Sequence, residues 1–144
     1  KMKLGTNGEA LIKYWEKLKL VGYLDGGGVP TIGWGHTGYG VRVGKKITKE
    51  VADALFDTDT SSAVAIINKL VTVPLTQNQF DTLVTFTYNV GNAAFAGSTL
   101  LKKLNAKLYA EVPAQLSRWN KDNGKVVKGL INRRNAEIEL WNSK

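Results

Sequence analysis

Cysteine is absent from the 144-residue sequence, and proline, histidine and methionine are scarce, with three, one and one residues. Without cysteine no disulfide can hold the fold, which suits synthesis in a reducing cytoplasm. A single histidine among scattered acids offers no set of residues with metal-ligand spacing, so we expect no metal and no cofactor. No apolar run approaches the ~18–20 residues of a membrane span, and the first residues, KMKLGTNGEA, lack the apolar stretch of a signal peptide.

Acidic residues are also few compared with basic ones, since 12 Asp and Glu face 20 Lys and Arg and leave a net charge of +8. Such an excess attracts polyanions over long range, so nucleic acid, anionic lipid and an acidic cell wall are all candidate partners. A solvated basic surface with no specific partner is the simpler alternative. The basic residues are spread along the chain and form no recognition helix, which argues against a nucleic-acid-binding domain.

The order of predicted elements indicates an α+β fold that is mainly helical. Glycine divides the segment from Gly22 to Lys46 into short β-favouring pieces, VGYL, VPTIGW and GVRV, which predict a small irregular antiparallel sheet. Most of the remaining chain has helical periodicity. We expect a single domain over 1–144, with lobes at about 1–47 and 70–144 and a connecting helix at about 48–69.

Capping residues predict where the helices begin and end. Thr6 or Asn7 is expected to cap a first helix, Thr48 to precede the connecting helix, and Thr76 and Gly91 to bound an apolar helix. Short helices follow Ser98 and surround EVPAQLSRW, and a last one covers Gly129 to Trp141, after an exposed polar linker, KDNGKVVK. The first helix is expected to bury Ala10, Leu11, Tyr14, Trp15 and Leu18, and the connecting helix Val51, Leu55, Ala63, Ile66, Ile67 and Leu70.

Glu16, Asp25 and Thr31 surround a turn with six glycines between Gly22 and Gly35. Two carboxylates close in sequence are the groups needed to protonate a leaving group and activate a water. Glu16 follows Tyr14 and Trp15, and an acid buried against apolar groups keeps its proton near neutral pH. Each residue alone also fits a structural role: a solvated helix-surface Glu, an Asp that caps a turn, and a β-branched Thr in a strand.

The combined pattern is more specific than its parts. E-x8-D-x5-T, together with T-I-G-x-G-H from Thr31 to His36, resembles the phage-type lysozymes and endolysins of glycoside hydrolase family 24. PLTQNQFDTLVTFTYNVGNAAFAGSTLLKKLN and GLINRRNAEIELW resemble the family's helical lobe, and the similarity is greatest to endolysins of lambdoid-like phages of Gram-negative hosts. The resemblance therefore covers most of the chain and implies a lysozyme-like fold.

The resemblance implies a muramidase that cleaves the β-1,4 bond between N-acetylmuramic acid and N-acetylglucosamine in peptidoglycan and lyses the host cell after phage infection. By position, Glu16 would protonate the glycosidic oxygen, while Asp25 and Thr31 would hold the attacking water, with inversion at the sugar. Tyr88 and Asn89 end an apolar helix at the family's cleft position and are expected to bind substrate; the alternative is an aromatic core residue and an Asn that ends a helix. Thr37 and Ser98 are further candidates for the cleft.

Three further positions are open to interpretation. His36 is expected to make a structural hydrogen bond rather than act in catalysis. Arg133 and Arg134 fit either a role in steadying the acidic site or a place on a solvated helix face. Lys17 stands where the family usually has Gly, directly after the catalytic Glu, and it is expected to point to solvent because adjacent helical residues face different directions.

The expected partner is peptidoglycan, bound by a monomer, and the positive charge is expected to favour an anionic outer membrane or cell wall, with the basic C-terminal helices disturbing membranes. The resemblance implies synthesis in the host cytoplasm and release by a holin to the periplasmic wall. The alternatives are a catalytically weakened relative that binds cell wall or membrane, and a basic nucleic-acid-binding domain.

Overall fold

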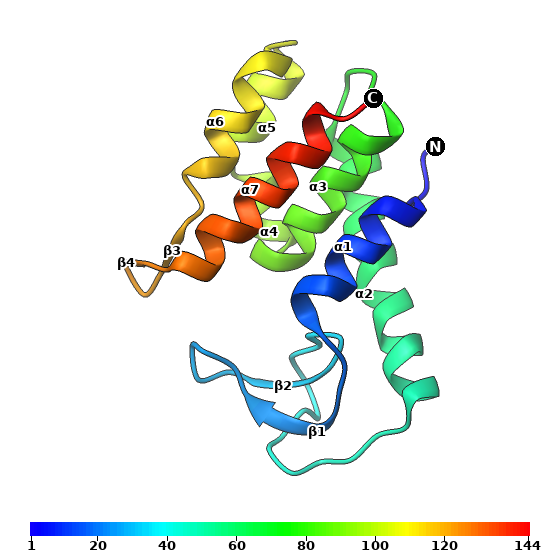
Figure 1. The fold of residues 1–144 in the computed structure, drawn as a ribbon. Helices are drawn as coiled ribbons and strands as arrows, with labels where there is room; N and C mark the ends of the chain where they lie inside the picture. Colours follow the sequence, from blue (N-terminus) through cyan, green and yellow to red (C-terminus); the bar gives the residue numbers. More distant parts are fainter.

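A 22-residue helix, α2 (Lys49–Leu70), connects a small β-containing lobe to a larger helical lobe in the computed structural model, which describes residues 1–144 (Figure 1). Thr48 is its N-cap, as predicted, and the Thr48 side chain accepts a hydrogen bond from the Val51 N–H at 3.2 Å. The prediction of the buried face of α2 is partly wrong, because Val51 is 45% exposed. The buried residues are Ala52, Phe56, Thr60, Ala63 and Ile67.

The small lobe contains two antiparallel strands, β1 (Lys19–Leu24) and β2 (Pro30–Gly33), which pair Tyr23 with Thr31. The prediction of a third strand at GVRV is wrong. Gly40, its first residue, and Gly38 before it both have positive φ, and hydrogen bonding to β1 comes only after the segment, through an isolated bridge between Val21 and Lys46 and neighbouring backbone hydrogen bonds. Glycines in the left-handed region break the extended run that a strand needs.

Helix α1 (Thr6–Glu16) begins after Gly5, so the predicted capping by Thr6 or Asn7 is wrong. Asp81 performs this function from another helix: its two carboxylate oxygens accept hydrogen bonds from the Gly5 and Gly8 N–H groups at 2.9 and 3.0 Å. The predicted buried face is also wrong, because Tyr14 is 64% exposed and the fully buried residues are Gly8 and Ile12. A distant carboxylate and close packing at Gly8 override the local capping preference.

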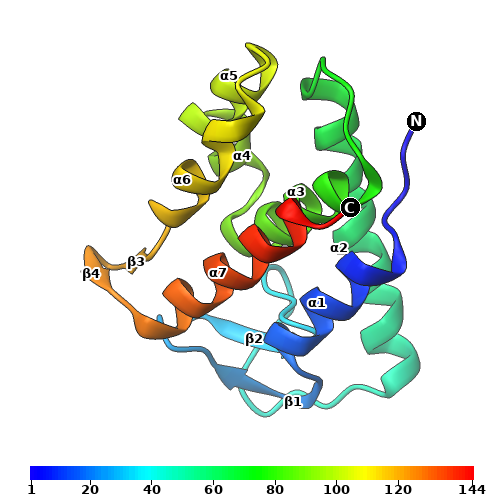
Figure 2. The same cartoon turned by 45° about the horizontal axis from the view of Figure 1, so that its top comes forward.

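Helix α3 (Gln77–Val90) lies at the centre of the large lobe, between α1, α2 and α7 (Figure 2). The predicted Thr76 cap is confirmed as a capping box with Gln79, and Gly91 ends the helix as predicted. Phe80, Leu83, Val84 and Phe86 are buried within one hydrophobic core. The remaining elements are α4 (Asn92–Ala96), α5 (Thr99–Asn105), the 3-10 helix η1 (Tyr109–Glu111), α6 (Val112–Ser117) and α7 (Lys128–Asn142).

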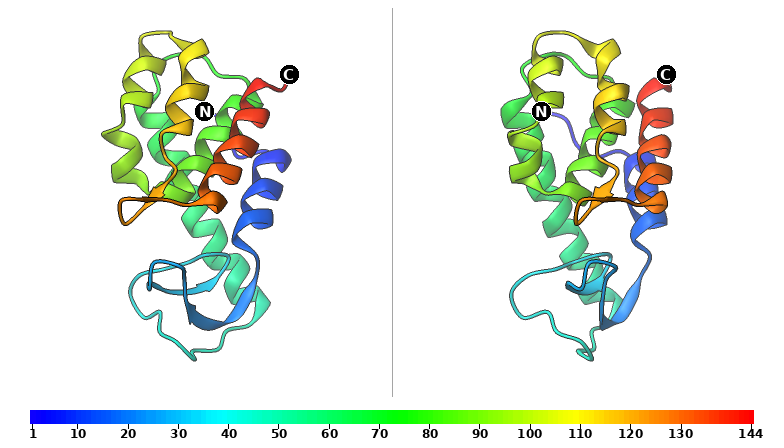
Figure 3. Two further views of the ribbon diagram at one scale, coloured as in Figure 1. Left: turned by 60° about the vertical axis from the view of Figure 1, so that its left-hand side comes forward. Right: turned by 90° about the vertical axis from the view of Figure 1, so that its left-hand side faces the viewer.

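The linker expected between the last two helices is exposed, but it forms a hairpin of two short strands, β3 (Lys121–Asp122) and β4 (Lys125–Val126) (Figure 3). Asn123 and Gly124 join the strands with φ of 51° and 77°. Two positive φ angles are typical of a tight hairpin turn, for which Asn-Gly is a strong sequence signal. None of the helices combines the length and the apolar character that crossing a membrane requires.

Candidate active site

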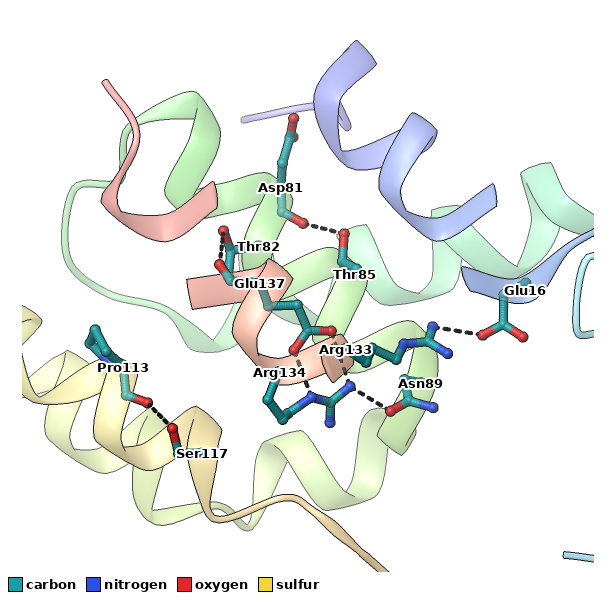
Figure 4. A network of polar contacts seen from close by, with 10 residues as sticks. All are labelled: Glu16, Asp81, Thr82, Thr85, Asn89, Pro113, Ser117, Arg133, Arg134 and Glu137. Carbon is teal, nitrogen blue, oxygen red and sulfur yellow. Dashed lines mark hydrogen bonds and ion pairs between the residues drawn. The ribbon is translucent and has the colours of Figure 1, made fainter. Parts of the chain in front are cut away.

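Glu16 is the last residue of α1, and its carboxylate is fixed from two sides. Arg133, on α7, donates a hydrogen bond from Nη2 to Glu16 Oε2 at 2.7 Å, and both side chains are largely buried, at 9% and 17% exposure (Figure 4). Gly35 lies directly against the other oxygen, because a Cβ built at Gly35 would be 2.2 Å from Glu16 Oε1. The prediction that apolar groups surround the carboxylate is therefore wrong, because its two oxygens contact a guanidinium and a glycine backbone.

Lys17 lies outside the helix rather than on its surface. Helix α1 ends at Glu16, and Lys17 has φ 59° and ψ 152°, a conformation that glycine adopts readily and other residues rarely do. Its ammonium lies 5.2 Å from the centroid of the Tyr14 ring and makes no ion pair with Glu16. The departure from the family pattern is therefore a matter of backbone strain rather than of charge beside the acid.

Asp25 follows β1 and holds the glycine turn. Its Oδ1 accepts hydrogen bonds from the Gly27 and Val29 N–H groups at 2.9 and 2.8 Å, while Oδ2 has no partner within the protein. Gly28 has φ 81°, which allows this tight turn. One carboxylate oxygen thus shapes the turn and the other remains free for a ligand.

Thr31 lies in β2 and is 4% exposed. Its hydroxyl donates to the Val29 carbonyl at 2.8 Å, so its lone pairs remain as acceptors. Across the sheet, the pKa of Tyr23 is raised by burial and then by the charges of Glu16 and Asp25. Both carboxylates therefore lie within electrostatic reach of one tyrosine.

A cleft of about 560 Å³ separates the two lobes beside these residues. The glycine turn from Asp25 to Gly27 lines one wall, and Asn89, Trp119, Asp122 and Arg133 line the other. The walls come close at Gly27, where a Cβ would be 3.4 Å from Asp122 Oδ2. Glu16 and Thr31 are not among the residues that line this cleft, but Arg133, which does line it, is hydrogen-bonded to Glu16. Trp119 and Asp122 were not among the predicted site residues, and the Asn-Gly signal of the β3–β4 hairpin was the one sequence clue to this wall.

Asn89 is held in the cleft by a buried ion pair (Figure 4). Arg134 Nη2 donates to Asn89 Oδ1 at 2.6 Å and to Glu137 Oε2 at 3.0 Å. Burial lowers the pKa of Arg134 and raises the pKa of Glu137 to about 7, although each charge partly offsets the effect on the other. The alternative in which Arg133 and Arg134 lie on a solvated helix face is wrong, because both are buried. Neither is therefore available to disturb a membrane.

The family model for phage lysozyme matches residues 13–137 of this chain. The chain belongs to the phage lysozyme family. An endolysin of Acyrthosiphon pisum secondary endosymbiont phage 1 is 41% identical over 146 residues, covering 99% of this chain and 99% of that protein. A SAR-endolysin of Escherichia phage Mu is 42% identical over 127 residues, covering 88% of this chain and 74% of that protein.

A solved structure, the muramidase domain of SpmX from Asticaccaulis excentricus, matches over 100% of both chains with a TM-score of 0.88 and 37% identity. These similarities confirm the predicted family and its lysozyme-like α+β fold. Membership covers the two lobes and the helix between them, because the matched residues extend from α1 to α7.

Of the other residues predicted to bind substrate, Tyr88 and Thr37 line a smaller hollow of about 200 Å³ beside Gly35. The Tyr88 hydroxyl donates to the Trp34 carbonyl. Burial raises the pKa of Tyr88, and the charges of Asp59 and Glu16 raise it further. Glu16 therefore contacts one lining residue of each hollow, Gly35 here and Arg133 in the main cleft.

Ser98 does not join these residues. It is the N-cap of α5 and is 6% exposed. Its hydroxyl donates to the Phe95 carbonyl at 2.7 Å and accepts from the Leu101 N–H at 3.1 Å. Both contacts serve the local fold, and Ser98 lines neither hollow.

His36 makes the structural hydrogen bond predicted for it. Its Nδ1 is 2.7 Å from Asp59 Oδ2 on α2, and its backbone pairs with Ile32 in both directions. Trp34 donates to Asp53 of the same helix at 2.9 Å. The segment after β2 is therefore attached to α2 at two carboxylates, and this attachment holds Gly35 against Glu16.

Proposed function

We propose that this protein is a peptidoglycan-hydrolysing lysozyme that cleaves the β-1,4 bond between N-acetylmuramic acid and N-acetylglucosamine, with Glu16 as general acid. One observation carries the proposal. Asp25 and Arg133 line the same cleft, Arg133 is hydrogen-bonded to Glu16, and the charges of Glu16 and Asp25 both raise the pKa of Tyr23. An acid and a second carboxylate across a cleft are the groups that glycoside hydrolysis needs.

Glu16 donates its proton to the glycosidic oxygen as the bond from that oxygen to the anomeric carbon breaks. Arg133 binds Oε2, so Oε1, which faces Gly35, is the oxygen that carries the proton. The sugar of the leaving group departs as an alcohol, and the anomeric carbon develops positive charge. Arg133 is a positioning residue in this step, because it acts through Glu16.

Asp25 takes a proton from the attacking water. Its Oδ1 is engaged with the turn, which leaves Oδ2 to accept that proton. Thr31 orients the same water by accepting a hydrogen bond, since its own hydroxyl proton is directed to Val29. Attack from the face opposite the leaving group inverts the anomeric centre.

Asn89, Tyr88 and Thr37 are proposed to contact the glycan. The Asn89 oxygen is bound to Arg134, so its amide N–H groups remain for acceptors on a sugar. Tyr88 and Thr37 lie in the smaller hollow, which Glu16 also contacts. Substrate that spans both hollows would pass the acid at its centre.

Lysis of the host follows from this activity, and the name of one relative, endolysin, supports it. We propose that the protein acts as a monomer, is made in the host cytoplasm and reaches the wall through a holin. A second relative is named SAR-endolysin, a signal-anchor-release protein, so coexpression with and without a holin tests the route. The nucleic-acid-binding alternative receives no support from the relatives.

The experiment is turbidity loss of purified peptidoglycan with the wild type and with Glu16→Gln. Because the variant keeps the shape but has no proton to donate, its rate is expected to fall by at least about 100-fold. Glu50→Gln, a change at an exposed residue of α2, is the matched control and is expected to match the wild type. Equal clearing by the wild type and Glu16→Gln would refute the assignment. NMR of the first product is expected to show the α-anomer, and the β-anomer would refute inversion.

A further inference from the structure

The small lobe carries half of the net positive charge in less than a quarter of the chain. Residues 17–48, between α1 and α2, contain five Lys or Arg residues and one acid, so this part of the chain holds +4 of the net charge of +8. The one acid is Asp25, whose carboxylate belongs to the cleft. The outer surface of the lobe is therefore strongly cationic.

Exposed apolar side chains occupy the same surface. Val21 is 47% exposed, Val43 is 58% exposed, and Tyr39 is fully exposed between two glycines. None of the three packs against the hydrophobic core. Arg42 and Lys46 are exposed beside them and make no ion pair. We name this surface the N-lobe tip, and its residues are Val21, Tyr39, Arg42, Val43, Lys45 and Lys46.

Backbone contacts hold the N-lobe tip in one piece. Gly22 N donates to the Lys45 carbonyl at 2.7 Å, and Gly44 N donates to the Gly22 carbonyl at 2.9 Å. Gly22 allows this approach, because a Cβ there would be 2.0 Å from the Arg42 carbonyl oxygen. Lys45 Nζ donates to the Gly40 carbonyl at 3.1 Å, which links the two turns. The tip lies at the end of the molecule remote from both termini (Figures 1 and 3).

We propose that the N-lobe tip docks on the surface of a bilayer rich in anionic phospholipid. The cations suit negatively charged headgroups, and each Lys or Arg near such a surface strengthens binding. Tyr39 suits the boundary between headgroups and acyl chains, where amphipathic aromatic rings gather. An anionic wall polymer would satisfy the cations but would leave Val21, Tyr39 and Val43 in water. The apolar side chains therefore favour lipid over polymer.

Docking in this way adds a property that hydrolysis does not require. The tip contains none of the residues that line the cleft, so membrane-bound protein keeps its cleft open. A lysozyme held at a membrane stays close to a wall that lies beside it. The site also differs from the C-terminal helices expected from the sequence, whose Arg133 and Arg134 are buried.

The test is cosedimentation of the full chain with large vesicles of phosphatidylcholine, alone or mixed with phosphatidylglycerol. The wild type is expected to bind only the anionic vesicles, and less at high salt. The paired change Arg42→Gln and Lys46→Gln is expected to weaken binding by more than about tenfold. Tyr39→Ser is expected to weaken it severalfold, because the ring no longer enters the interface.

Lys69→Gln with Lys102→Gln is the matched control, since it removes the same charge from exposed, unpaired residues elsewhere. Equal weakening by this pair would overturn the proposal in favour of a general effect of charge. Wild-type binding by Tyr39→Ser would also overturn it, in favour of attraction to any polyanion. Unchanged thermal unfolding and wall hydrolysis in all variants would show that they fold. Loss of wall hydrolysis in the wild type would refute the proposed activity without bearing on vesicle binding.

Discussion

Replacing Lys17 by Gly and by Ala tests whether the residue after Glu16 is strained. Lys17 has φ 59° and ψ 152°, which only glycine adopts without steric cost. Both substitutions remove the contact between the Lys17 ammonium and the Tyr14 ring, so that contact cancels when the two variants are compared. The difference between them reports the backbone alone.

The expected difference follows from two opposing effects. A non-glycine residue in this region costs about 1–3 kcal/mol, and Ala retains this strain whereas Gly relieves it. Glycine in turn makes the unfolded chain more flexible, which costs about 0.4–1 kcal/mol. The Gly variant should therefore exceed the Ala variant by about 1 kcal/mol in free energy of unfolding. This is the reverse of the order found within helices, where Ala is the more stable residue.

Thermal and urea unfolding measure the difference. For a chain of 144 residues, about 1 kcal/mol corresponds to about 3 °C in Tm. The same comparison at Ala10, an exposed position inside α1, is the control, and there Ala10→Gly is expected to lower stability. A Lys17→Ala protein as stable as the Lys17→Gly protein would refute the strain argument and the positive φ on which it rests.

Two further predictions concern Glu16 and the buried ion pair. Gly35→Ala places a Cβ 2.2 Å from Glu16 Oε1, so wall hydrolysis is expected to fall about 100-fold, whereas Gly38→Ala, strained but with open space around it, should retain activity. Equal losses would contradict the role of this contact. Burial raises the pKa of Glu137 from 4.5 to about 7, so its contribution to stability is full below pH 4.5 and is lost as the pH rises to about 7. In urea unfolding, the free energy of unfolding of Glu137→Gln should rise relative to that of the wild type between pH 4.5 and about 7. A difference in free energy that stays constant over this range would contradict the raised pKa.

Local patterns predicted much of the architecture. Thr48, Thr76 and Gly91 mark helix ends through short-range contacts with their own neighbours, and each cap is observed where the sequence places it. The spacing E-x8-D-x5-T indicates the family, since it fixes the order of a helix end, a glycine turn and a strand. The errors at α1 have a common cause. Asp81 caps that helix from a position more than seventy residues away, and no local pattern contains such a partner.

The same distinction separates the parts of the site. Asp25 shapes its own turn through N–H groups two and four residues away, so a sequence can suggest it directly. Glu16 depends on Arg133, which is 117 residues further along the chain, and on Gly35, which is held in place by the attachment of its neighbours to α2. Neither contact can be predicted from the sequence, because both form only when distant elements pack together. The chemistry of the acid is therefore a property of the tertiary structure, and this is why two arginines whose spacing left their role open become, once folded, the residues that orient Glu16 and Asn89.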